Sequence, residues 1–106
     1  MVKKKKIAFF DRDGVLNKTL IKQRKPIAPR NINQFEINSQ AKEIISYLKN
    51  NDFIVIVVTN QPDVGNGLVE KKIVDQMNQR LKSNLLIDEI FVCFHSQKDN
   101  CNCRKP

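Results

Sequence analysis

Two uninterrupted apolar runs constrain the fold of this chain most strongly. The segments 6–10 and 53–58 have strand length, and neither alternates apolar with polar side chains. Such runs are typical of strands that are buried on both faces, as in a parallel sheet. A third and weaker run extends from Ile90 to Phe94. We therefore expect three strands of one parallel sheet.

Two amphipathic helices are predicted between these strands. From Ser39 to Asn50 the apolar residues follow the i, i+3, i+4, i+7 spacing of a helix that buries one face. We expect Ser39 to be the N-cap of this helix. The same periodicity predicts a second helix over roughly 70–83. The element order indicates an α/β fold, a Rossmann-like parallel sheet in β-α-β-α-β order with right-handed crossovers.

Composition limits the class of molecule. The 106 residues are 41% hydrophobic and 28% charged, which suits one small globular domain. No apolar run approaches the roughly 20 residues that span a bilayer, and the one after Lys3–Lys6 is too short for a signal peptide. We expect a cytoplasmic protein with reduced cysteines and no membrane partner. The net charge of +8 favours an anionic partner without choosing among phosphate esters, nucleic acids and acidic lipids.

The segment 17–36 fits neither periodicity. It carries Pro26, Pro29 and five basic residues, namely Lys18, Lys22, Arg24, Lys25 and Arg30. We expect a long basic loop or flap, because loops of this length inside compact domains are usually functional. A solvated loop and a flap that meets a second phosphate or another acidic group are equally open interpretations.

Polar side chains follow each of the three predicted strands, in the segments 11–14, 59–61 and 93–95. In an open parallel sheet, ligands bind beyond the carboxyl ends of the strands. A carboxylate fixed there, such as Asp11, can attack phosphorus, and a second one, such as Asp13, can protonate the leaving oxygen and then deprotonate water. Two close carboxylates also attract Mg²⁺. The alternative is an exposed acidic turn in which Gly14 supplies a positive φ.

Every cysteine and the sole histidine fall within one short segment, as Cys93, His95, Cys101 and Cys103. Four such ligands match a closed tetrahedral Zn²⁺ site, although the spacing is not that of a zinc finger. Because four protein ligands leave no open coordination position, we expect a structural zinc ion in a loop over 93–104. Three incidental thiols beside a surface histidine, or a disulfide, are the alternatives.

The ordered motifs resemble those of the haloacid dehalogenase (HAD) superfamily of phosphatases. The segment 7–17 is similar to the first motif of that superfamily and 57–61 to the second. The segment 101–106 resembles the third-motif region of the heptose bisphosphate and histidinol-phosphate phosphatases. The resemblance implies a HAD-like domain over 1–106. It also implies a Mg²⁺-dependent phosphatase that hydrolyses a sugar bisphosphate such as heptose 1,7-bisphosphate, or histidinol phosphate, through an aspartyl-phosphate intermediate.

By position, the resemblance implies a role for each motif residue. Asp11 would be the nucleophile and Asp13 the general acid/base, with Mg²⁺ held by the Asp11 carboxylate and the Asp13 main-chain carbonyl. The substrate would be bound by Thr59 on a phosphoryl oxygen, by Asn60 and Gln61, by Arg104, and by Lys105 against the phosphoryl charge. The zinc loop is expected to fold the segment that presents Arg104 and Lys105.

The sequence departs from the superfamily pattern in two places. No acidic fourth motif follows Lys105, so we expect an incomplete domain that self-associates through the unpaired edge of its first strand. A complete domain would be a monomer. After Gln61, Pro62-Asp63 and Asn66-Gly67 stand where relatives commonly carry a small residue, glycine and an arginine. That difference leaves the identity of the substrate open.

Two other functions stay open. A polynucleotide 3′-phosphatase resembles the first two motifs and suits the basic charge. However, strand-binding grooves usually stack bases on aromatic side chains, and this chain has no Trp and one Tyr. We therefore expect a small phosphorylated metabolite and no nucleic-acid partner. The non-enzyme alternative is a truncated remnant that keeps zinc and a phosphate-sized pocket and acts as a binding module.

Overall fold

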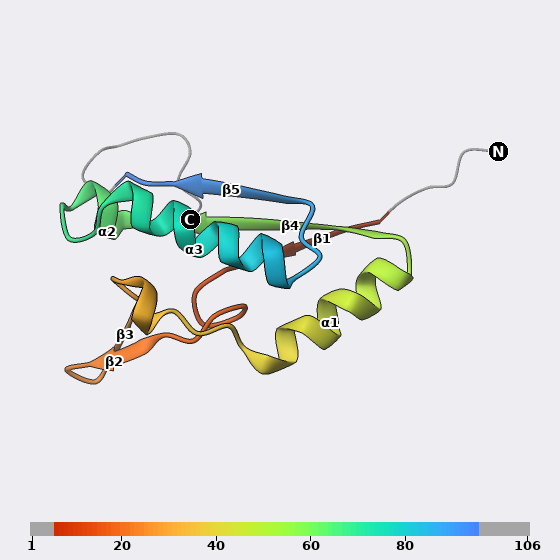
Figure 1. Cartoon of the computed structure of the whole chain (residues 1–106), viewed down its shortest axis with the longest axis horizontal. Helices are drawn as coiled ribbons and strands as arrows, with labels where there is room; N and C mark the ends of the chain where they lie inside the picture. Colours follow the sequence, from red (N-terminus) through yellow and green to blue (C-terminus); the bar gives the residue numbers. More distant parts are fainter. Residues whose placement is uncertain (1–5, 96–106) are drawn as a thin grey trace.

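The computed structural model describes residues 6–95 and is built around a parallel sheet (Figure 1). Its three strands lie in the order β1-β4-β5 and comprise β1 Lys6–Phe10, β4 Phe53–Asn60 and β5 Glu89–Cys93. Both strand pairs are parallel, with Ala8 beside Val55 and Thr59 beside Val92. The predicted α/β fold with a parallel sheet is confirmed.

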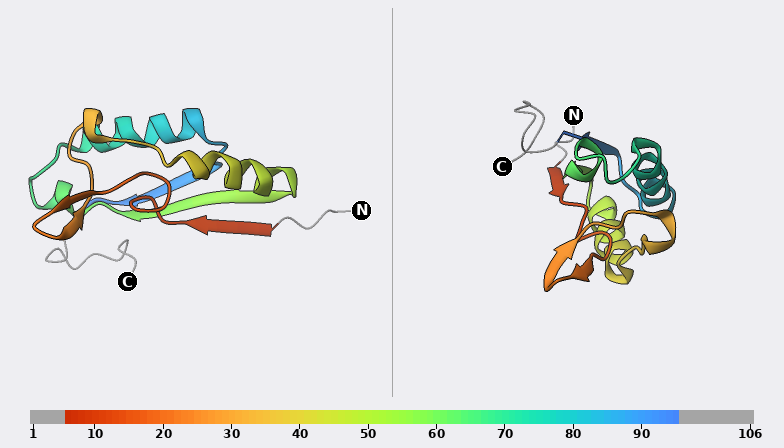
Figure 2. Two further views of the ribbon diagram at one scale, coloured as in Figure 1. Left: turned by 90° about the horizontal axis from the view of Figure 1, so that it is seen from below. Right: turned by 90° about the vertical axis from the view of Figure 1, so that its left-hand side faces the viewer.

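Two long helices cover one face of this sheet, namely α1 Ser39–Asn50 and α3 Lys71–Asn84. Because the order of the strands in the sheet follows the chain, two crossovers of the same hand place both helices on the same side, as Figure 2 shows. The core between helices and sheet includes Ala41, Ile45, Val55, Val57, Met77 and Leu81.

The opposite face of the sheet is apolar and largely exposed, so the prediction of strands buried on both faces was wrong. Phe9 is 67% exposed, Phe91 56% and Ile7 51%. Successive side chains of a strand point to opposite faces, and both described crossover helices lie on the other face. Within residues 6–95, β1 is also an edge strand that pairs with β4 alone.

The helices begin close to where periodicity places them, but the cap of α1 is one residue earlier than expected. The side chain of Asn38, not Ser39, accepts a hydrogen bond from the backbone N–H of Gln40 at 3.3 Å. Ser39 is the first residue of the helix. Asn38 precedes it with an extended backbone and is therefore the N-cap. Glu70, which the predicted helix included, is the N-cap of α3.

The segment 17–36, predicted as a long basic loop or flap, contains regular structure that the sequence did not indicate. It holds an antiparallel hairpin and one 3-10 turn, comprising β2 Leu20–Lys22, β3 Lys25–Ile27 and η1 Ile32–Gln34. Strands of three residues are too short to show periodicity. The hairpin turn is made by Gln23 and Arg24, both at positive φ, rather than by the Gly or Asn that usually mark such a turn. The short helix α2, Pro62–Gly65, was also not predicted.

Two expectations fall wholly or partly outside the described residues. Of the proposed zinc loop over 93–104, only the part up to His95 is described. Arg104 and Lys105 lie outside the described residues as well. As for membranes, none of the helices within residues 6–95 combines the length and the apolar character that a bilayer crossing requires.

Candidate active site

The first motif forms a tight turn at the carboxyl end of β1. The backbone N–H of Leu16 donates to the carbonyl of Arg12 at 2.9 Å, and Gly14 donates to the carbonyl of Asn17 at 2.8 Å. Gly14 has φ +83°, a conformation that glycine adopts without strain. Leu16 is 1% exposed and fixes the far side of the turn in the core.

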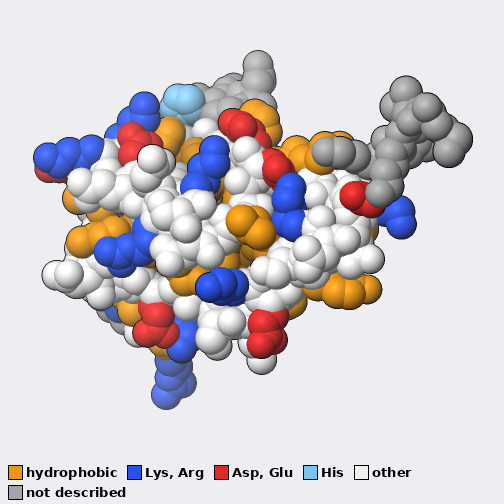
Figure 3. All heavy atoms as spheres, turned by 45° about the vertical axis from the view of Figure 1, so that its right-hand side comes forward, with side chains coloured by type: hydrophobic (Ala, Val, Ile, Leu, Met, Phe, Trp, Pro, Cys, Tyr) orange, Lys and Arg blue, Asp and Glu red, His pale blue; other side chains and the backbone are white. Residues whose placement is uncertain are grey.

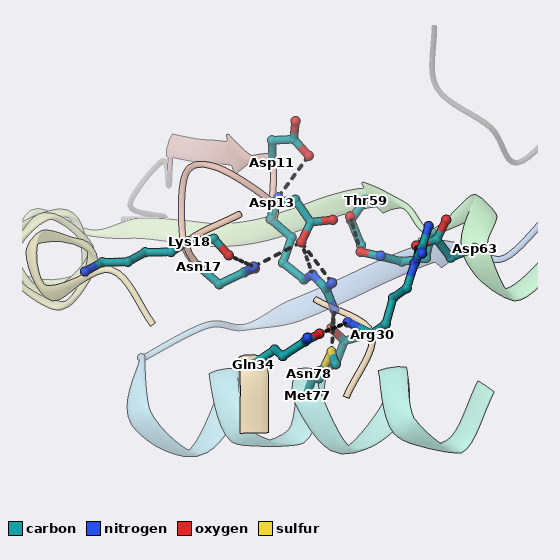
Figure 4. A network of polar contacts seen from close by, with 12 residues as sticks. Asp11, Asp13, Asn17, Lys18, Arg30, Gln34, Thr59, Asp63, Met77 and Asn78 are labelled. Atoms are coloured by element: carbon teal, nitrogen blue, oxygen red, sulfur yellow. Dashed lines mark hydrogen bonds and ion pairs between the residues drawn. The ribbon is translucent and has the colours of Figure 1, made fainter. Parts of the chain in front are cut away.

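This turn gives the two candidate carboxylates different surroundings. Asp11 is exposed, and its Oδ1 accepts the backbone N–H of Arg12 at 2.9 Å. The Oδ1 of Asp13 accepts the Nδ2 of Asn17 at 3.0 Å and the side chain of Arg12 through Nε at 3.2 Å and Nη2 at 2.9 Å (Figure 4). Asp13 is therefore fixed through one oxygen, while its side chain keeps 20% of its surface exposed.

Arg12 is completely buried between the turn and α3. Its Nη1 donates to Asn78 Oδ1 at 3.1 Å, and its guanidinium lies 5.5 Å from the centre of the Phe35 ring. Burial lowers the pKa of Arg12 from its ordinary value, and the neighbouring carboxylates of Asp13 and Asp11 act in the opposite direction. The salt bridge to Asp13 compensates the charge that burial takes out of water.

The second motif lies at the end of β4. The hydroxyl of Thr59 donates to Gln61 Oε1 at 2.8 Å, and the two residues are 1% and 2% exposed. The backbone N–H of Gln61 donates to the carbonyl of Cys93 at 2.8 Å, which ties the end of β4 to the end of β5. Asn60 is half-buried.

A cavity of about 220 Å³ joins the two motifs to the hairpin segment. Its lining comprises Asp13, Asn60 and Gln61 from the motifs, Pro26, Ile27, Ala28 and Arg30 from the hairpin segment, and Pro62 and Asp63 from α2. Across it, Arg30 Nε donates to Asp63 Oδ2 at 3.1 Å. The structure thus gathers three of the predicted residues around one cavity. Asp11 and Thr59 are not part of this lining, although each lies within two residues of a lining residue in the chain.

Several polar residues of this region have no individual role in the sequence-based prediction, which names Arg30 only as one of the basic residues of the flap. Arg12 and Asn17 lie within the first motif, and this position was the one signal in the sequence that they belong to the site. Asn78 is 8% exposed and lies on the buried side of α3, beside Met77. Its one signal in the sequence is that it is a polar residue on an otherwise apolar helix face. Arg30 and Asp63 lie in segments without periodicity, and their pairing depends on the tertiary fold.

The donors at the end of β1 suit a hard cation. Mg²⁺ is usually bound by one or two carboxylates together with waters and substrate phosphates, and the exposed Asp11 supplies such a carboxylate. Among the described residues, no three side chains of His, Cys, Asp or Glu gather as a metal site. Cys93 and His95 do approach each other, with Sγ 3.8 Å from Nδ1, and Cys93 also takes part in a disulfide bond.

Comparison with known proteins gives consistent relatives. A family model described as "Polynucleotide kinase 3 phosphatase" matches residues 6–106. The chain is 36% identical over 106 residues to a probable D-glycero-D-manno-heptose-1,7-bisphosphate 7-phosphatase of Thermoplasma volcanium, which covers 95% of the chain and 68% of that relative. It is 31% identical over 110 residues to the histidine biosynthesis bifunctional protein HisB of Legionella pneumophila, covering 96% of the chain and 29% of HisB.

A solved structure agrees with these sequence relatives. The crystal structure of D,D-heptose 1.7-bisphosphate phosphatase from B. bronchiseptica, complexed with magnesium and phosphate, superposes with a TM-score of 0.78 at 25% identity. The match covers 95% of this chain and 56% of that one. The chain spans 58% of a Helicobacter pylori heptose bisphosphate phosphatase and 52% of one from Mycobacterium tuberculosis. From these matches, the chain belongs to the polynucleotide kinase 3 phosphatase family, in the branch of the HAD superfamily that comprises the heptose bisphosphate and histidinol-phosphate phosphatases.

Proposed function

We propose that this chain carries the nucleophile of a phosphatase that hydrolyses a phosphate monoester of a small metabolite. A sugar bisphosphate such as heptose 1,7-bisphosphate is the first substrate class, and histidinol phosphate is the second. The observation that carries the proposal is the cavity at the carboxyl edge of the sheet, which Asp13 of the first motif lines together with Asn60 and Gln61 of the second. The printed names of the relatives support the substrate class.

The two aspartates are proposed to act in two steps, phosphoryl transfer to Asp11 and hydrolysis of the aspartyl phosphate. The Asp11 carboxylate attacks phosphorus, the bond to the ester oxygen breaks, and Asp13 gives its proton to that leaving oxygen. Asp13 then takes a proton from water, which attacks the aspartyl phosphate and releases inorganic phosphate with Asp11 regenerated. Asp11 is exposed enough to meet phosphorus, and Asp13 borders the cavity.

Mg²⁺ is the proposed cofactor, held by the Asp11 carboxylate and the Asp13 main-chain carbonyl. When bound, it would neutralise part of the phosphoryl charge. The magnesium and phosphate in the B. bronchiseptica structure support this assignment. Thr59 and Lys105 are proposed to contact the phosphoryl oxygens, with Asn60, Gln61 and Arg104 on the substrate. In the described state the Thr59 hydroxyl is directed to Gln61, so a contact with phosphate requires that hydroxyl to turn.

The hairpin segment is the proposed source of substrate selectivity. It contributes Arg30 to the cavity, where the side chain is 33% exposed and paired with Asp63. A second phosphate on a sugar bisphosphate would compete with Asp63 for this guanidinium, since Arg binds phosphate oxygens in a fixed geometry. Arg30 is thus the member of the basic flap best placed to recognise a doubly charged substrate.

A structural zinc ion bound by Cys93, His95, Cys101 and Cys103 also stays a proposal. The approach of Cys93 to His95 supports it, and the disulfide bond of Cys93 is the competing arrangement. Reduced cytoplasmic thiols would favour the metal. Zinc analysis of the purified chain decides between them. One zinc per chain, lost in Cys93→Ser, supports the site, and a metal-free chain with two cysteines resistant to thiol reagents overturns it.

The test of the proposed function is phosphate release, in Mg²⁺, from three substrates assayed side by side. These are a sugar bisphosphate, histidinol phosphate and a 3′-phosphorylated oligonucleotide, with Asp11→Asn as the inactive control. We expect release from a metabolite, fastest from the bisphosphate, and none from the variant. A folded chain that releases phosphate from no substrate would leave the binding module as the better account.

The family description favours one further candidate, a polynucleotide 3′-phosphatase. The charge of +8 is compatible with it, but on the face shown in Figure 3 the Lys and Arg side chains are scattered among acidic ones. A nucleic-acid groove would gather them along one path. Preferential release from the oligonucleotide, with binding that weakens steeply as salt rises, would establish this candidate instead.

A further inference from the structure

A buried arginine inside the first motif is the least expected feature of the site. Arg12 is 0% exposed, although a buried charge is costly unless it is paired and hydrogen-bonded. Its guanidinium has partners on both sides, because Nε and Nη2 bind Asp13 while Nη1 binds Asn78. The second partner lies 66 positions away on α3. The arginine therefore connects the catalytic turn to the helix behind it.

The contacts of Arg12 leave little freedom for the guanidinium to move. Nη1 also contacts Met77 Sδ at 3.9 Å, and the Phe35 ring packs on the group. Met77 is 0% exposed and Phe35 5%, so both belong to the rigid core. Because the guanidinium is planar and fixed by these contacts, its Nε–H and one Nη2–H both face Asp13 (Figure 4).

These contacts give the two carboxylate oxygens of Asp13 different surroundings. Oδ1 accepts both Arg12 contacts and, from the other flank, the Nδ2 of Asn17. Within residues 6–95, Oδ2 accepts none of the hydrogen bonds found. Asp13 borders the cavity and is 20% exposed. One oxygen is thereby fixed to the protein, and the other is left for a proton that moves to or from a ligand.

We propose that Arg12, anchored by Asn78, is a positioning residue that selects Oδ2 of Asp13 as the proton-transfer oxygen and holds it toward the cavity. The inference rests on the proposed function, since it assigns to Arg12 a task in the protonation of the leaving group. A carboxylate free to rotate would expose either oxygen and would lose the alignment that proton transfer requires.

The choice of leaving group tests this role. A sugar alkoxide must be protonated as it leaves, whereas p-nitrophenolate is a stable anion that leaves without a proton. Misalignment of Asp13 should lower kcat for a sugar phosphate by about 10²-fold in Arg12→Met and about tenfold in Asn78→Ala. Neither loss exceeds the roughly 10²- to 10⁴-fold that a general acid contributes in full. The kcat for p-nitrophenyl phosphate should fall far less, and Arg12→Lys should recover part of the loss.

The controls separate positioning from folding. Gln79→Ala changes an exposed neighbour of Asn78 on the same helix and should leave both substrates unaffected. Circular dichroism reports whether each variant folds. If Arg12→Met does not fold, the comparison of the two substrates in Asn78→Ala tests the positioning role. Equal losses on the two substrates in a folded variant would overturn the inference alone. An unaltered chain that acts on neither substrate would overturn the proposed function, and the inference with it.

Discussion

At the scale of single residues, the site depends on a turn that only glycine makes without strain. Gly14 has φ +83°, and a Cβ there would lie 3.8 Å from Thr19 Cγ2, an ordinary contact. The cost of a side chain is therefore conformational rather than steric. The same turn positions Asp13 and Asn17 relative to each other, so its geometry bears on chemistry as well as stability.

Gly14→Ala should lower the free energy of unfolding by about 1–2 kcal/mol because of its backbone conformation. It should also reduce phosphate release. Gly67→Ala is the matched control, since Gly67 has φ +76° with open space around it. Urea unfolding should give both variants a similar loss of stability, and only Gly14→Ala should lose activity. Equal activities would show that the turn does not position Asp13.

At the scale of elements, α3 both completes the core and anchors the first-motif turn through Asn78 and Arg12. Leu81 is 0% exposed, and Leu86, just beyond the helix, is 61% exposed. Leu81→Ala should cost about 2–5 kcal/mol through lost contacts and a cavity. Leu86→Ala should change stability by about 0.5 kcal/mol or less. Thermal unfolding of the two variants measures this difference, and similar losses would contradict the described packing.

The hairpin segment 17–36, which holds β2, β3 and Arg30, is the second part of the fold with a specific expectation. Arg30→Ala should raise KM for a sugar bisphosphate by about tenfold, equivalent to about 1.4 kcal/mol of lost phosphate binding. The KM for a monophosphate should change little. Arg24→Ala removes an exposed arginine from the hairpin turn and is the matched control. An Arg30 variant with unchanged KM values would remove the hairpin from substrate recognition.

How far the sequence predicts these elements depends on their length. Strands β1 and β4 stand out as uninterrupted apolar runs, and helices α1 and α3 are long enough to show periodicity. The positions of all four agree with prediction within a few residues. Strands β2 and β3 have three residues each and are too short to show periodicity, and the turn between them lacks glycine. In the site, Asp11 and Asp13 stand out as a motif, whereas the link from Arg12 to Asn78 exists only after α3 packs on the sheet.

At the scale of the whole molecule, the sheet separates a packed face from an exposed one. Ile7, Phe9 and Phe91 lie opposite the two crossover helices, and β1 pairs on one side only within residues 6–95. Self-association therefore stays a prediction for the 106-residue chain. Light scattering should detect more than one copy, and Phe9→Lys should reduce the mass. A monomer at all concentrations would contradict this expectation.

The central claim is that Asp11 becomes phosphorylated during turnover, and acid quenching tests it most directly. The chain is mixed with a sugar bisphosphate and Mg²⁺, stopped in acid, digested and analysed by mass spectrometry. We predict one phosphoryl group on the peptide that contains Asp11, removable by hydroxylamine as an acyl phosphate and absent in Asp11→Asn. Turnover that persists in Asp11→Asn, or phosphate released with no phosphorylated peptide under single-turnover conditions, would contradict the account.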